Sequence, residues 1–251
     1  MNVLAAGWEA PPGVRAFTTL RTGGTSEPPY GSLNLGTHVG DDPVRVAANR
    51  RLVQQSWGWA AEPLWLDQVH GTTVVRASDQ GSAPRADGAV TDQRGRPLVV
   101  LTADCLPVVA CDREGTVVGA FHAGWKGLLA GVLEAGLRAM DRPARDLLVW
   151  VGPAIGPESY QVGPEVRDAF LASNPEHRRE FTDDGPDHWR FDLAGAAVRR
   201  LADEGVVHVV RSPWDTLRDA DLFFSHRRST GQGTTCGRMG TFIVLEERKE
   251  S

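Results

Sequence analysis

The clearest pattern of apolar and polar residues lies in the middle of the chain. Short apolar runs rich in β-branched residues cover Leu98–Ala103, Leu106–Cys111 and Thr116–Phe121, and turn residues bound them. Runs of this kind predict buried strands. From Gly124 to Met140 the apolar residues instead recur every three or four positions, which predicts one amphipathic helix after the third strand.

Strands and helices are interspersed along the rest of the chain. An apolar stripe over Pro43–Trp57 predicts a helix with Asp42 as its N-cap, and the Gly-, Pro- and Ser-rich stretch Thr22–Asp42 predicts an ordered loop. The same criteria predict strands at Leu147–Val151, Val206–Val210 and Thr241–Leu245, and helices at Pro164–Ser173 and Leu193–Glu204. No shift in composition marks a linker. We therefore expect a single domain over residues 1–251, of α/β class (mixed α+β), with mixed β-sheets packed against helices.

Composition and charge narrow the class of protein. With 41% hydrophobic residues in a chain of 251, a sizeable core can be buried. The net charge is −5 and no Lys/Arg run stands out, which argues against nucleic acid as a partner, because that binding needs clustered cations. The N-terminal stretch lacks a signal-peptide pattern, and no apolar run approaches the roughly 20 residues of a membrane span. We expect a cytoplasmic protein without a membrane partner; the oligomeric state stays open.

The cysteines and histidines raise the question of a metal site. Three cysteines, an odd and low number, are typical of free thiols in a reducing compartment. His70, Cys105 and His122 each fall at the end of a predicted element, where side chains can converge, and Zn²⁺ readily takes imidazole and thiolate ligands. Their spacing matches no short metal motif. The alternative at this point is that Cys105 is a small buried apolar residue and His70 a turn residue.

Several other catalytic motifs are absent from the sequence. Without HExxH the chain is not a zincin, and without HxE and PCxxC it lacks the usual pattern of zinc nucleobase deaminases. There is no GxSxG nucleophile elbow and no GxxxxGK[ST] phosphate loop. These absences leave the Cys/His set as the main candidate for chemistry.

Longer motifs resemble a known family over roughly residues 14 to 245. The sequence is similar to the multicopper polyphenol oxidase, or laccase-domain, family, reassigned in part as purine nucleoside phosphorylases with adenosine deaminase activity. The motifs that carry this resemblance are RTGGTSEPPYGSLNLGTHVGDDP, NRRLV, DQVHGTTVV, DGAVT, LTADCLPVVACD, FHAGWKGLLAGVL, VGPAIGPESYQVGPEV and FFSHRRSTGQGTTCGRMGTFI. The C-terminal motif departs from the family pattern, with His226 where Tyr is expected and with Cys236 and additional residues nearby. The resemblance implies a fold similar to that of bacterial toxin deamidases with a Cys–His pair.

The resemblance also implies roles for particular residues. It places the metal ligands on His70 in QVHG, Cys105 in TADC and His122 in HAGW, and we expect the same three residues to act in catalysis. Zn²⁺ is the expected ion, although Cu²⁺ is possible because it binds such N/S sites more tightly. Purine nucleosides and phosphate are the implied substrates. Candidate residues that contact them or support the ligands are Arg21, Asn34, Lys126 and Arg238 for substrate, and Gln68 and Asp104 beside the ligands.

Three functions of different classes remain. The first is zinc-dependent phosphorolysis of adenosine, inosine, guanosine or methylthioadenosine, with deamination of adenosine, and it is the function that the resemblance favours. The second is copper-dependent polyphenol oxidation, although none of the seven histidines forms the His-x-His pairs common in multicopper sites. The third is a Cys–His hydrolase with Cys105 as nucleophile and His122 or His70 as base.

Overall fold

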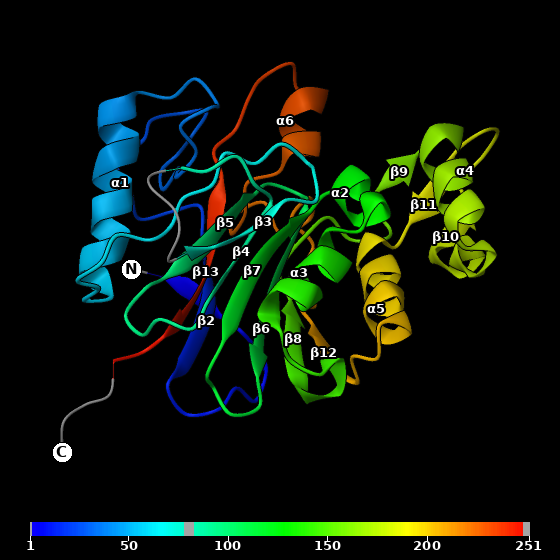
Figure 1. The fold of residues 1–251 in the computed structure, drawn as a ribbon. Coiled ribbons are helices and arrows are strands. Elements are labelled where there is room, and N and C mark those ends of the chain that lie inside the picture. The colour runs from blue at the N-terminus through cyan, green and yellow to red at the C-terminus, as the bar shows by residue number, and fades with distance from the viewer. Residues whose placement is uncertain (1, 78–82, 248–251) are drawn as a thin grey trace.

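The computed structural model describes residues 2–77 and 83–247, and its strands form three sheets (Figure 1). An antiparallel sheet contains, in spatial order, β1 (Val3–Ala5), β2 (Val14–Thr19), β13 (Met239–Leu245) and β5 (Leu98–Thr102). A mixed sheet contains β12 (His208–Arg211), β8 (Leu147–Val151), β6 (Leu106–Asp112), β7 (Val118–Ala123), β4 (Gly88–Thr91) and β3 (Val74–Arg76). A small antiparallel sheet contains β10 (Phe181–Asp183), β11 (Trp189–Phe191) and β9 (Gln161–Val162).

The helices cover the outer faces of the two larger sheets (Figure 1). On one side, α1 (Pro43–Ser56) packs against the four-stranded sheet. On the other side, the six-stranded sheet is covered by α2 (Trp125–Ala130), α3 (Val132–Met140) and α5 (Leu193–Asp203). The small sheet forms a lobe at the right of the picture with α4 (Pro164–Ser173) and the 3-10 helix η3 (Pro175–Glu180). Helix α6 (His226–Gly231) lies near the top, and the 3-10 helix η2 (Ala144–Asp146) precedes β8.

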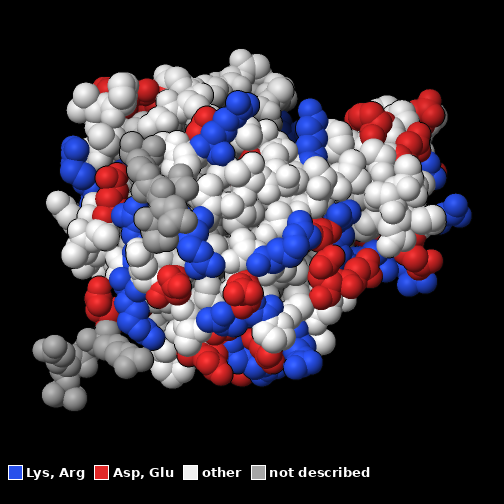
Figure 2. Space-filling model, viewed as in Figure 1, with Lys and Arg blue, Asp and Glu red and all other residues white. Residues whose placement is uncertain are grey.

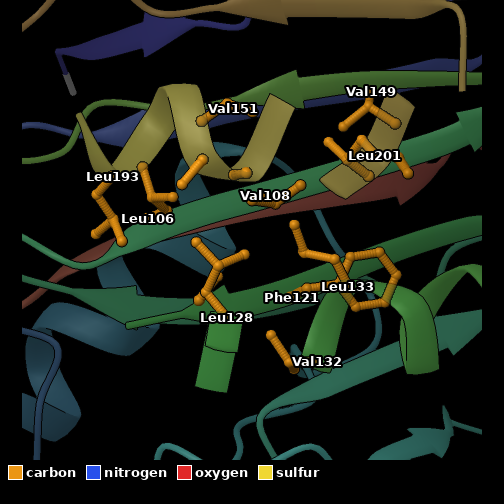
Figure 3. Packing of buried hydrophobic residues seen from close by; sticks show 14 of the residues in the cluster. Leu106, Val108, Phe121, Leu128, Val132, Leu133, Val149, Val151, Leu193 and Leu201 are labelled. Atoms are coloured by element: carbon orange, nitrogen blue, oxygen red, sulfur yellow. The ribbon is translucent and has the colours of Figure 1, made fainter. Parts of the chain in front are cut away.

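Apolar side chains fill each interface between these layers. Val100 and Ile243 of the four-stranded sheet pack with Val109 and Trp150 of the six-stranded sheet. On the opposite face of the six-stranded sheet, residues of β6, β7 and β8 pack against α2, α3 and α5 (Figure 3). Strands β6 and β7 are buried over their whole length, which explains why their sequences are continuous apolar runs rather than alternating ones. This rigid centre carries two of the three candidate ligands at its end.

Most of the predicted elements are present, and the expected class of mixed sheets packed against helices is confirmed. The side chain of Asp42 accepts a hydrogen bond from the amide of Val44, as an N-cap should. The single helix predicted over Gly124–Met140 is wrong. Gly131 has a φ of 99°, a left-handed conformation that ends α2 and begins α3 in a new direction.

Two further differences concern strands. The strand predicted at Val206–Val210 begins later, at His208, because the amide of Val206 bonds the carbonyl of Leu201 and completes the end of α5. The short strands of the small sheet were not predicted, because runs of two or three residues carry too little periodicity.

Charged side chains are mixed in sign on the face shown in Figure 2. Lys and Arg alternate with Asp and Glu around a broad uncharged area. No helix among residues 2–77 and 83–247 has both the length and the apolar character needed to span a membrane. The three cysteines are free thiols, as their number predicts.

Candidate metal centre

His70, Cys105 and His122 converge where three separate segments of the chain meet. His122 lies near the end of β7, Cys105 in the tight connection between β5 and β6, and His70 in the loop before β3. Their potential ligand atoms all lie within 4.8 Å of one another. Nε2 of His70 is 3.7 Å from Sγ of Cys105, and the two imidazole rings lie edge to face with centroids 4.7 Å apart.

The backbone is held in an unusual conformation on both sides of the site. His70 has a φ of 60° and Asp104 a φ of 87°, values that cost non-glycine residues about 1–3 kcal/mol and persist only where the surroundings enforce them. Asp104 is anchored by its carboxylate, which accepts hydrogen bonds from Thr216 Oγ1 (2.6 Å), Ser225 Oγ (3.0 Å) and the amide of Arg227 (2.7 Å). The turn that presents Cys105 is therefore fixed to the start of α6.

The loop that carries His70 is tied to the sheet by Gln68. Its side-chain amide donates to the carbonyl of Leu101 (2.8 Å), and its oxygen accepts from the amide of the same residue (2.7 Å). These two bonds attach the loop to β5 as an additional strand residue would. Gln68 and Asp104 thus both support the segments that carry ligands, Gln68 through the backbone of Leu101 and Asp104 through two hydroxyls and one backbone amide.

A fully buried carboxylate, Asp87, lies behind the three candidate ligands. Its Oδ1 accepts from Nδ1 of His122 (2.8 Å) and from the amide of His70 (2.9 Å), and its Oδ2 accepts from the amides of Val69 (3.2 Å) and Gly71 (2.6 Å). Asp87 is not among the residues predicted for the site. The available signal was a carboxylate directly before a strand of small residues, in the DGAVT motif.

Charge in the site is arranged so that the thiol ionises easily. Burial by itself raises the pKa of Cys105, but hydrogen bonds from His122 and His70 outweigh it and lower the pKa to about 6. Burial likewise lowers the pKa of His122, and its bonds to Asp87 and Cys105 outweigh this and raise the pKa to about 9. Near neutral pH the metal-free site therefore holds a thiolate beside an imidazolium.

The geometry and chemistry of the three residues fit a zinc ion. Zn–S and Zn–N distances of about 2.3 and 2.1 Å with tetrahedral angles place the two ligand atoms about 3.6 Å apart, close to the 3.7 Å between Cys105 and His70. A Cβ added at Gly124 would lie 2.7 Å from Cδ2 of His70 and 3.0 Å from Sγ of Cys105, so this position keeps the space around the ligands open. Three ligands leave a position for a further group, as in catalytic zinc sites.

The low pKa of Cys105 gives a direct expectation for the metal-free protein. Because only the thiolate reacts, alkylation of Cys105 by iodoacetamide should reach half its maximal rate near pH 6, instead of near pH 8.5 as for an ordinary thiol. The rate is measured from pH 5 to 9 by mass spectrometry of the Cys105 peptide. Cys111, which is buried and whose pKa is raised to about 12, serves as the internal control and should stay unmodified. A Cys105 profile with its midpoint above pH 8 would contradict this description of the site.

Two of the candidate ligands, His70 and Cys105, line a cavity of about 400 Å³, while the third, His122, is buried. Trp125 and Tyr160 supply aromatic surface, while Lys126, His226 and Arg227 supply exposed nitrogen groups. Asp104 is the one carboxylate among the described lining residues, and both of its oxygens already accept hydrogen bonds. The cavity therefore favours a ligand that is planar in one part and anionic in another. Tyr160, His226 and Arg227 are lining residues that no motif assigned to the substrate.

Of the four predicted substrate contacts, Lys126 is the one among the described lining residues of the cavity. Arg21 donates instead to the carbonyls of Ala220 (2.7 Å) and Gly31 (3.3 Å) and lies over the ring of Phe224. These bonds join the Thr22–Asp42 loop to the C-terminal part of the chain. Its guanidinium thus bonds backbone carbonyls in this arrangement, and its contact with substrate stays a prediction.

Asn34 and Arg238 belong to the same structural region. Asn34 is fully buried, and its side chain bonds the backbone of Gly36, the carboxylate of Asp41 and the amide of Arg238. The guanidinium of Arg238 donates to the carbonyls of Cys236 and Gly237 at 3.0 and 3.1 Å. Sequence alone could not separate these turn-forming contacts from contacts with a ligand, since Asn and Arg serve both.

Comparison with known proteins places the chain in a family. Residues 15–246 match the family model described as multi-copper polyphenol oxidoreductase laccase. The chain belongs to this family. Among curated relatives of this laccase family, purine nucleoside phosphorylase PA4543 of Pseudomonas aeruginosa is 47% identical, with 97% of this chain and 98% of the relative covered. Purine nucleoside phosphorylase YfiH of Escherichia coli is 42% identical, with 95% and 96% covered.

Solved structures of relatives share the fold of this laccase-family chain. A Neisseria meningitidis protein superposes with a TM-score of 0.93 at 42% sequence identity, covering 98% of this chain and all of the other. YlmD of Geobacillus stearothermophilus gives a TM-score of 0.84 at 32% identity, covering 94% and 93%. The family and the mixed-sheet architecture that the motifs implied are both confirmed.

Proposed function

We propose that the protein is a zinc-dependent purine nucleoside phosphorylase that also deaminates adenosine. Adenosine, inosine, guanosine and methylthioadenosine are the proposed nucleosides, which react with phosphate to give a free base and a ribose 1-phosphate. The observation that carries the proposal is the cavity beside His70, Cys105 and His122, with aromatic walls and exposed cations in one space. The curated relatives named purine nucleoside phosphorylase support it.

The residues proposed to hold zinc are His70 and His122 through their imidazoles and Cys105 through its thiolate. Nδ1 of His122 donates to Asp87, which leaves Nε2 as the nitrogen for a metal. When bound, Zn²⁺ supplies Lewis acidity and favours the formation of hydroxide from water near neutral pH. The same ligand set is proposed to serve both reactions, because each forms a bond between an oxygen nucleophile, phosphate or water, and a carbon of the nucleoside.

The remaining lining residues bind and orient the reactants. Trp125 and Tyr160 would hold the purine by their ring faces, and Lys126 and Arg227 would hold phosphate. In phosphorolysis a phosphate oxygen bonds to C1′ of the ribose while the C1′–N9 bond breaks, and the base leaves with that electron pair and takes up a proton. In deamination water adds at C6 and ammonia leaves. The cations stabilise the negative charge of phosphate during the first reaction.

Lys126→Ala should therefore impair phosphorolysis while leaving the deamination of adenosine nearly unchanged. Among the described residues no carboxylate forms an ion pair with Lys126 or Arg227. One guanidinium nitrogen of Arg227 donates to the carbonyl of Gln161 at 3.0 Å, which leaves its other nitrogens and the ammonium of Lys126 for phosphate. Loss of a charge-assisted hydrogen bond of about 1.5–3 kcal/mol should raise KM for phosphate by about 10-fold or more. The rate of inosine formation without phosphate should stay within about 2-fold of the wild-type rate, because phosphate takes no part in that reaction.

The control for this experiment is Arg138→Ala, which removes an exposed cation of α3 away from the cavity. Steady-state rates at varied phosphate concentration measure both variants. If Lys126→Ala slows deamination as much as phosphorolysis, or if Arg138→Ala raises KM for phosphate equally, Lys126 does not bind phosphate.

The proposed function is tested by the products formed from adenosine. Purified zinc-loaded protein is incubated with adenosine in the presence and absence of phosphate, and adenine and inosine are separated by chromatography. Adenine should form only with phosphate, and inosine should form in both cases. If adenosine, inosine, guanosine and methylthioadenosine all remain unchanged, nucleoside chemistry is wrong for this protein.

A Cys–His hydrolase is the second candidate, favoured by one observation. A thiolate with a pKa of about 6 beside His122 and His70 is also a competent nucleophile. The two functions differ in their response to metal removal: chelation abolishes a zinc-dependent reaction, whereas a Cys105 nucleophile stays active until it is alkylated. Polyphenol oxidation, which the family description suggests, is less favoured, because the described residues bring together a single three-ligand group.

A further inference from the structure

Asp87 accepts more hydrogen bonds than are needed to orient a single metal ligand. Its carboxylate is 0% exposed and accepts four hydrogen bonds, three from consecutive backbone amides and one from an imidazole. A buried carboxylate is costly to maintain unless it is satisfied by donors, and here all the donors belong to two segments that carry candidate ligands.

We propose that Asp87 is the positioning residue of the metal centre: this one carboxylate fixes the ring of His122 and the backbone of His70 together. The inference rests on the proposed function for the identity of the centre. It adds that two of the three ligands are not independent, because they share one anion. Cys105 is held separately, through the bonds of Asp104 to Thr216, Ser225 and the amide of Arg227.

The contact with His122 sets which ring nitrogen can bind a metal. Nδ1 lies 2.8 Å from Oδ1 of Asp87, and an ionised carboxylate has no proton to donate, so Nδ1 carries the hydrogen. The backbone of His122 is bonded to the same residue, since its amide donates to the carbonyl of Asp87 at 2.7 Å. His122 is thus bonded to Asp87 through both its backbone and its ring, and Nε2, the nitrogen on the side away from Asp87, is left to face Cys105 or a metal.

The contact with the His70 loop uses the same carboxylate in a different way. The amides of Val69, His70 and Gly71 point to it at distances of 3.2, 2.9 and 2.6 Å. Three converging amides form a site for an anion, and His70 sits in it with a φ of 60° that needs such compensation. An asparagine side chain would bring an NH₂ group against these amides or against Nδ1 of His122, so it cannot satisfy all four donors.

Asp112 provides a matched control within the same chain. It is also buried, at 3% exposure, and its Oδ1 accepts from the amides of Thr116 and Val117 at 2.7 and 3.0 Å. It is the last residue of β6, and its hydrogen bonds reach none of the candidate ligands. Asp112→Asn makes the same chemical change in a similar environment, away from the metal centre.

The test compares zinc affinity in Asp87→Asn and Asp112→Asn with that of the wild-type protein, by competition with a zinc-binding dye. Loss of a group that orients metal ligands typically weakens metal binding by about 10- to 100-fold, and we expect this for Asp87→Asn only. Thermal unfolding of both variants checks that they fold. Wild-type affinity in folded Asp87→Asn, or an equal loss in Asp112→Asn, would overturn the proposal.

A second measurement needs no variant. Nitrogen NMR of histidine in the zinc-loaded wild-type protein should show His122 with its proton on Nδ1, and a proton on Nε2 instead would also overturn the proposal. Neither measurement uses a nucleoside. If the protein does not act on nucleosides but Asp87→Asn weakens zinc binding, the proposed function is wrong and the positioning role stands. If the protein acts on nucleosides but Asp87→Asn binds zinc as tightly as the wild type, the positioning role is wrong and the proposed function stands.

Discussion

Cys105→Ala should lower kcat/KM for the phosphorolysis of adenosine by about 1000-fold or more. The variant removes the thiolate among three candidate ligands and leaves two imidazoles, one of them exposed, too few for the typical catalytic zinc site. A 1000-fold loss corresponds to about 4 kcal/mol of transition-state stabilisation, within the range expected when a catalytic metal is lost. Deamination of adenosine should fall with it, because both reactions are proposed to use the same centre.

Cys111→Ala is the matched control for this variant. Cys111 lies in β6, is fully buried, and belongs to the interface between the two larger sheets rather than to the cavity. It should retain wild-type activity and zinc content, apart from a small loss of stability. Elemental analysis of both variants accompanies the kinetics. Activity of Cys105→Ala within 10-fold of the wild type would show that the thiolate is not needed and that the proposed centre is wrong.

Phe121→Ala should lower the free energy of unfolding by about 3–5 kcal/mol. The ring is 1% exposed and packs between β7 and α3, in the cluster shown in Figure 3. Three glycines pack directly against the ring: a Cβ added at Gly88, Gly119 or Gly136 would lie 2.8, 2.5 or 2.5 Å from a ring carbon. Because these neighbours have no side chains to move into the space, the cavity should collapse only partly.

Phe121→Leu fills part of the same space and should cost less, about 1–2 kcal/mol. Urea unfolding of the zinc-loaded variants, followed by fluorescence, measures both changes. A loss below 1 kcal/mol for Phe121→Ala would mean that the core around β7 repacks freely, contrary to the close approach of the three glycines.

The secondary structure was predictable where periodicity is long. The runs Leu106–Cys111 and Leu147–Val151 appear as β6 and β8 because strands buried on both faces are apolar throughout. Short strands such as β9 and β10 have two or three residues each, too few for an alternating pattern, so their sequences carry little signal even though β10 pairs with the nearby β11. Long periodicity can also mislead. The helical spacing of apolar residues continues across Gly131, where the chain changes direction and α2 gives way to α3.

The candidate metal ligands could be predicted from the sequence, but the residues that support them and line the cavity could not. Soft and imidazole ligands at element ends, together with the family motifs, pointed to His70, Cys105 and His122. Asp87 and Arg227 could not be placed in this way, because their roles follow from contacts between segments far apart in sequence. The tertiary structure decides which polar residues of a motif face the cavity and which hold a turn.

The most direct test of the central claim is the activity of metal-free protein as Zn²⁺ is added back. Adenine release from adenosine and phosphate should be absent at the start, rise in proportion to added zinc, and reach a plateau near one ion per chain. Alkylation of Cys105 before the titration should prevent this recovery. Full activity of the metal-free protein, abolished only when Cys105 is alkylated, would contradict the account and identify Cys105 as a nucleophile instead.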